Sequence, residues 1–64
     1  MKPRAQAIAE LKNNGYEFRR HGMRHDIYAN PKTGDIIPLK RHDFDEGDLR
    51  YIKKEIAQND RRRG

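Results

Sequence analysis

Three strand-like segments separated by turn formers fill residues 16–39, "YEFRRHGMRHDIYANPKTGDIIPL". The segments 16–20 and 25–29 alternate apolar or aromatic residues with polar ones, which is typical of half-buried strands. "NPKTG" at 30–34 is dense in turn formers, so residues 35–39 are expected to return antiparallel as a third strand. The sequence therefore predicts a three-stranded antiparallel sheet.

The faces of these strands are only partly predictable. Alternation places Tyr16, Phe18 and Arg20 on one face of the first strand. Phe18 is expected in the core, whereas Tyr28 could either pack in the core or stack on a nucleic-acid base. Pro38 has no amide hydrogen to donate, so it is expected at a sheet edge or at the end of a strand.

Amphipathic helices are predicted on both sides of the strands. The first covers residues 5–14, with Pro3 suited to its first turn and Gly15 to a left-handed C-terminal conformation. The second opens near Asp45, which can cap it, and Asp48 three residues on resembles the acidic member of a capping box. The apolar side chains expected to pack on the sheet are Ile8, Leu11, Leu49, Ile52 and Ile56.

The order of these elements predicts an α+β fold, α-β-β-β-α, with both helices on one face of the sheet. This arrangement resembles the architecture of a double-stranded-RNA-binding domain, which by itself assigns no function. One domain is expected over 1–58, followed by a basic, disordered tail at 59–64.

The composition favours a nucleic-acid partner. The 64 residues carry 15 Lys and Arg against 10 Asp and Glu, a formal charge of +5, and clustered cations attract phosphates. The absence of cysteine excludes disulfides, thiol nucleophiles and thiolate metal sites. The N-terminal segment lacks the apolar region of a signal peptide and no run is long enough to span a bilayer, so a cytoplasmic protein is expected.

Few residues offer chemistry. His21 and His25 lie in strand-like sequence, and the acidic residues of 42–46 are expected to stabilise a helix N-terminus, so no metal site is predicted. Thr33 lies in a turn without a base beside it, which disfavours acyl transfer.

RNA cleavage needs less machinery, because the 2′-hydroxyl of the substrate attacks the adjacent phosphate. One imidazole can move the proton, and nearby cations can stabilise the phosphate charge. His25, with Arg24 beside it, is the candidate. The alternative is a surface or strand-start histidine with no catalytic role. The alternation of residues along the strand does not settle which sheet face His25 occupies.

The motif order "LKNNGYEF…GMRHDIY.NPKTG.IIPLKRHDFDEGDLRYIKKEIA" resembles the HicA (YcfA-like) family of bacterial mRNA interferase toxins over residues 5–57. The resemblance implies an endoribonuclease of a toxin–antitoxin system that cuts single-stranded mRNA without a metal ion or other cofactor. It also implies neutralisation by a HicB-type antitoxin, through which any contact with DNA would be indirect. The catalytic histidine of the family falls on His25 and its downstream histidine on His42, while Arg24 stands where many members have Gly or Ser.

The side chains expected to bind RNA lie on the strands or just after the third one: Arg19, Arg20, Arg24, Tyr28, Lys40, Arg41 and His42. Among them, Arg20, Arg24 or Lys40 would stabilise phosphate charge. A non-catalytic RNA-binding module of the same fold is the alternative, with His25 contacting only the RNA backbone. A small structural or ribosome-associated protein is a third interpretation.

Overall fold

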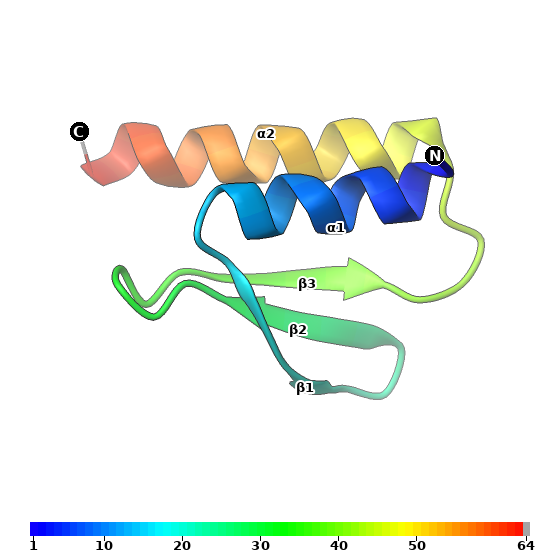
Figure 1. The fold of residues 1–64 in the computed structure, drawn as a ribbon, viewed down its shortest axis with the longest axis horizontal. Coiled ribbons are helices and arrows are strands. Elements are labelled where there is room, and N and C mark those ends of the chain that lie inside the picture. The colour runs from blue at the N-terminus through cyan, green and yellow to red at the C-terminus, as the bar shows by residue number, and fades with distance from the viewer. Residues whose placement is uncertain (64) are drawn as a thin grey trace.

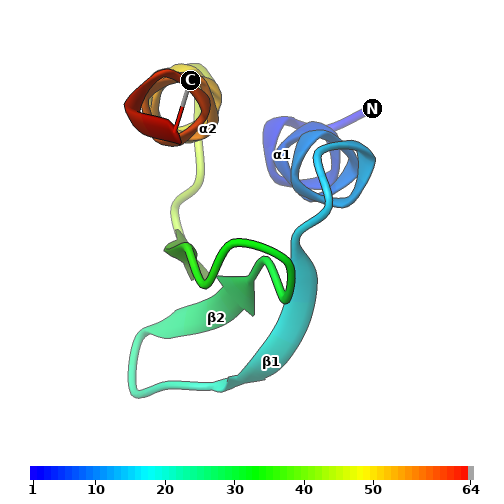
Figure 2. The ribbon, with the colours of Figure 1, turned by 90° about the vertical axis from the view of Figure 1, so that its left-hand side faces the viewer.

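The computed structural model describes residues 1–63, and its elements follow the predicted order. They are α1 (Pro3–Asn13), β1 (Glu17–His21), β2 (His25–Ala29), β3 (Ile36–Lys40) and α2 (Glu46–Arg63). The strands form one antiparallel sheet in the order β1-β2-β3. Figures 1 and 2 show the helices side by side over the same face of this sheet. The predicted α-β-β-β-α fold is confirmed.

The core lies between the helices and the sheet. Leu11, Leu49, Ile52 and Ile56 are buried as predicted, and Ile8 packs against them partly buried. The sheet contributes further buried side chains, namely Tyr16, Tyr28, Ile37 and Leu39. Neither helix described here is both long and apolar enough to span a bilayer. The opposite face of the sheet carries no helix (Figure 2) and is open.

Local signals set the helix ends. Gly15 adopts a φ of +89° just after α1, in the left-handed region that favours glycine. At the start of α2, the amides and carboxylates of Asp45 and Asp48 bond reciprocally at 3.0 Å. The predicted capping box is therefore present. Pro38 lies in β3, an edge strand, as its missing amide hydrogen predicts.

The structure differs from the expected disordered tail over residues 59–63, which continue α2. Asn59 is buried, and its Nδ2 donates to the hydroxyl of Tyr16 at 2.8 Å. Arg62 and Arg63 both pair with Asp35 beyond the β2–β3 turn. These polar contacts hold the last turns of α2 although that segment contains no apolar residue. Gly64, the end of the expected tail, lies outside the described residues.

A β-bulge at Arg19 changes the predicted faces of β1. Phe18 pairs with Tyr28, but Arg20 pairs with Ile27, so one extra residue lies between the two pairs. Directly paired residues share a face, and successive residues of β2 alternate. Phe18 therefore points to the helix side and Arg20 to the open side, contrary to the expectation that both share one face. Phe18 is also 46% exposed rather than in the core, because β1 is an edge strand.

Candidate active site

His25 is the first residue of β2 and lies on the open side of the sheet. It pairs with Lys40 of β3, and it precedes Asp26, which is buried on the helix side. Within residues 1–63, no hydrogen bond occupies the imidazole, and the side chain is exposed. His25 lines three neighbouring surface hollows, so a ligand can approach its ring from several directions.

The β1–β2 turn fixes the backbone of His25. The amide of Gly22 donates to the carbonyl of His25 at 2.7 Å. A Cβ on Gly22 would lie 2.8 Å from the same oxygen, so this close approach requires glycine. The Arg41 guanidinium donates to the carbonyls of Met23 and His25. The turn is thus tied to the segment after β3, and the imidazole projects from a supported backbone.

Asp26 supports the same region from the helix side. Its carboxylate accepts from Arg4 of α1 at 2.7 Å, from His21 of β1 at 2.7 Å and from Arg41 at 3.1 Å. The hydrogen bond from His21, then those from Arg41 and Arg4, lower the pKa of Asp26 from 3.8 to about 2, although burial acts in the opposite direction. One carboxylate therefore joins α1, β1 and the loop after β3.

Cationic side chains surround His25 on the open side. Arg20, placed there by the bulge, and Arg24 line one hollow with His25. Arg24 and Lys40 line a second, together with His42. The Lys40 ammonium lies 3.2 Å from Asp48, so its charge is partly neutralised. Arg20 and Arg24 make no ion pair within residues 1–63, which leaves both available for an anionic ligand.

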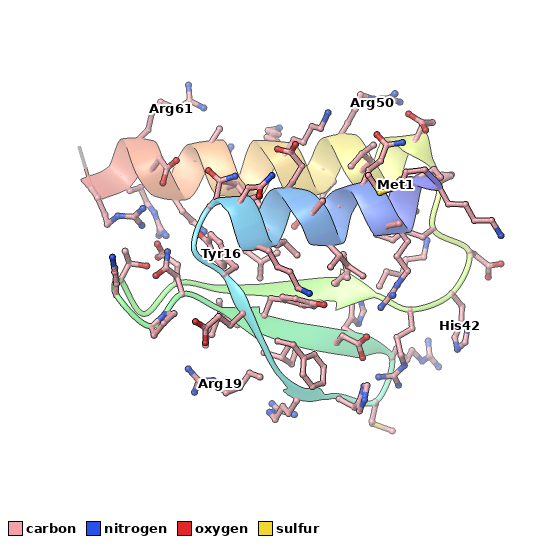
Figure 3. All side chains as sticks on the ribbon, in the orientation of Figure 1. Met1, Tyr16, Arg19, His42, Arg50 and Arg61 are labelled. Atoms are coloured by element: carbon pink, nitrogen blue, oxygen red, sulfur yellow. The ribbon has the colours of Figure 1, made fainter. Side chains whose placement is uncertain are left out.

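The structure brings only part of the predicted RNA-binding set together. His42 lines a hollow with His25, whereas Figure 3 shows Arg19 on β1, well away from His42 in the β3–α2 loop. Arg41 is engaged by the turn and by Asp26, and therefore acts in support rather than as a free contact. For Tyr28, included in the RNA-binding set, the sequence left core packing and base stacking open; its ring is only 5% exposed and is packed in the core, so it is not available for stacking.

Sequence reasoning missed the roles of Arg4 and Asp26. The available signal was alternation along β2, which grouped charged Asp26 with Tyr28 on a face that proved to be buried. A buried carboxylate requires partners. The alternation along β2 could not identify these partners, because Arg4 and Arg41 are brought to Asp26 only by the packing of α1 and the path of the loop after β3.

The acidic residues near His42 serve the helix start. In residues 1–63, no three His, Asp or Glu side chains are grouped so that they could hold a metal ion. The Asp48 carboxylate accepts a hydrogen bond from the Asp45 amide, and the Asp45 carboxylate accepts one from the Asp48 amide. Asp48 also pairs with Lys40.

Comparisons with known proteins assign no family to this chain. No protein-family model matches it, and neither a curated protein nor a solved structure matches it. The resemblance to HicA toxins rests on the motif order in residues 5–57. The chemistry of the His25 site is therefore inferred from its own residues.

Proposed function

We propose that this protein is a HicA-type toxin endoribonuclease, an mRNA interferase that cleaves single-stranded mRNA by metal-independent acid/base catalysis at His25. The observation that carries this proposal is the exposed, unbonded imidazole at the junction of three hollows. Arg20 and Arg24 lie around it, and the backbone beneath it is held by Gly22 and Arg41. A positioned imidazole can move the proton in phosphodiester cleavage, and the two arginines can stabilise the phosphate charge.

In this reaction, neutral His25 takes the proton of the 2′-hydroxyl as that oxygen attacks the adjacent phosphorus. The bond from phosphorus to the 5′-oxygen of the next nucleotide breaks, and the leaving oxygen takes a proton from the imidazolium or from water. The products are a 2′,3′-cyclic phosphate and a 5′-hydroxyl. Arg20 and Arg24 donate to the non-bridging oxygens, where negative charge builds up in the transition state.

A single-stranded substrate suits this surface. The hollow that Arg20 and Arg24 line with His25 is open to solvent, and the rest of its lining comes from the β1–β2 turn, β2 and β3. A nucleotide in single-stranded RNA can turn away from its neighbours, which the in-line approach of the 2′-oxygen requires, whereas a base-paired nucleotide is held in the duplex.

Incubation of the purified chain with single-stranded RNA in the presence of EDTA tests the proposal. We expect fragments that end in a 2′,3′-cyclic phosphate, and much slower cleavage of the same sequence when it is annealed to its complement. Salt-dependent binding without any cleavage would contradict the proposal and would favour the non-catalytic RNA-binding module.

We further propose that a small acidic antitoxin of the HicB type covers the His25 region. The formal charge of +5 and the exposed side chains of Arg20, Arg24 and Met23 support this partner. Attraction between opposite charges would make association fast and sensitive to salt. Co-expression with an acidic product of the neighbouring gene should give a stable complex that no longer cleaves RNA. A chain that stays free and active beside that product would contradict the proposal.

A further inference from the structure

Tyr51 is an exposed aromatic residue beside His25. It lies in α2 between the buried residues Leu49 and Ile52, yet 56% of its own surface is exposed. The hollow that it lines also contains His25, Pro38 and Lys40. This position brings α2 to the candidate active site.

The other aromatic side chains are placed differently. Tyr16 and Tyr28 are buried. Phe44 lines the same hollow as Tyr51, but its ring packs partly buried against the core. Phe18 is exposed but lies on the helix side of β1, where its ring contacts His21 and Tyr28. Within residues 1–63, Tyr51 is therefore the aromatic residue that is both largely exposed and next to His25.

We propose that Tyr51 stacks on the base of a nucleotide that flanks the scissile phosphate. This inference rests on the proposed function, which puts that phosphate at His25. The hollows on the other sides of His25 are lined by Arg20 and Arg24, groups that bind phosphate. The hollow toward α2 instead offers a tyrosine ring and Pro38, which suit the flat face of a base.

The charged groups of this hollow are already paired, because Asp48 and Lys40, which both line it, lie 3.2 Å apart. A neutral base can stack on Tyr51 without disturbing this ion pair, whereas a carboxylate of a partner would compete with Asp48 for Lys40. Stacking also tolerates any base, so Tyr51 would hold the strand without demanding one sequence.

A tryptophan at this position would report the contact directly. The chain contains no tryptophan, so Tyr51→Trp introduces a single tryptophan, whose fluorescence can be excited apart from that of the tyrosines. Uncleavable 2′-O-methyl RNA should quench its fluorescence, whereas Phe18→Trp, an exposed ring on β1 at the opposite edge of the sheet from β3, should respond weakly. RNA binding without quenching of the Tyr51→Trp variant would overturn the inference, as would equal quenching by polyglutamate.

Affinity and kinetics separate this inference from the proposed function. Tyr51→Ala should weaken binding of the uncleavable RNA about tenfold, because stacking on an aromatic ring contributes about that factor per base. Tyr51→Phe should retain affinity, whereas Tyr51→Leu, which lacks a π-face, should behave like Tyr51→Ala. With cleavable RNA, KM should rise more than kcat falls. Loss of affinity in Tyr51→Ala and Tyr51→Leu together with a wild-type chain that never cleaves would contradict the ribonuclease proposal but support the stacking contact. Unchanged affinity in both variants would overturn the contact even if cleavage is observed.

Discussion

Replacement of His25 by alanine is expected to lower the rate of RNA cleavage by at least about a hundredfold, the usual minimum for loss of a general acid or base. The imidazole is exposed and bonds to no other group of residues 1–63, so its removal should leave the fold intact. The rate is measured in single-turnover experiments with end-labelled single-stranded RNA, and the fold by circular dichroism.

The other two histidines serve as matched controls. His42 lines a hollow with His25 but lies in the loop after β3, so His42→Ala should reduce cleavage only modestly through weaker RNA binding. His21 bonds to Asp26 on the helix side, so His21→Ala should act on stability more than on chemistry. Cleavage by His25→Ala at the wild-type rate would contradict the assignment of His25.

Replacement of Asp26 by asparagine is expected to lower the free energy of unfolding by about 2–4 kcal/mol at neutral pH, as for the loss of a buried, multiply bonded carboxylate. Arg4, His21 and Arg41 would all lose their charged acceptor. Urea denaturation measures the change. Asp60→Asn is the control, because within residues 1–63 that exposed carboxylate pairs only with Arg63, and its loss should change stability by no more than about 0.5 kcal/mol.

The same carboxylate makes stability depend on acid. Because the pKa of Asp26 is lowered from 3.8 to about 2 in the folded chain, its contribution is present above the unfolded value and is lost as the pH falls through the folded one. The difference in stability between wild type and Asp26→Asn should therefore shrink from pH 4 to pH 2. A difference that stays constant over this range would contradict the carboxylate network.

The order of elements was predictable because its signals are local. The turn formers of 30–34, the capping pair Asp45 and Asp48, and helical periodicity each act within a few residues. The length of α2 was not predictable from the sequence, because its last turns contain no apolar residue. They are held instead by the contact of Asn59 with Tyr16, which lies 43 positions away in the chain.

The candidate site was predictable only in part. His25 and Arg24 followed from the sequence, but the bulge that brings Arg20 to the same face depends on pairing between strands. Phe18 was misjudged and the placement of Tyr28 was left open, because their burial depends on which strand is central and where the helices cover it. Tyr51 lies outside the stripe of buried residues on α2, which indicates an exposed ring, but only packing places it beside His25.

The central claim is that His25 activates a 2′-hydroxyl of the RNA itself. The most direct test compares an RNA carrying a single 2′-deoxynucleotide at the main cleavage site with the unmodified RNA, each incubated with wild type and with His25→Ala. We predict that wild type cuts the unmodified RNA to a 2′,3′-cyclic phosphate, that the deoxy substitution abolishes this cut alone, and that His25→Ala cuts neither RNA. Cleavage at the deoxy position, or cleavage by His25→Ala at the wild-type rate, would contradict the account.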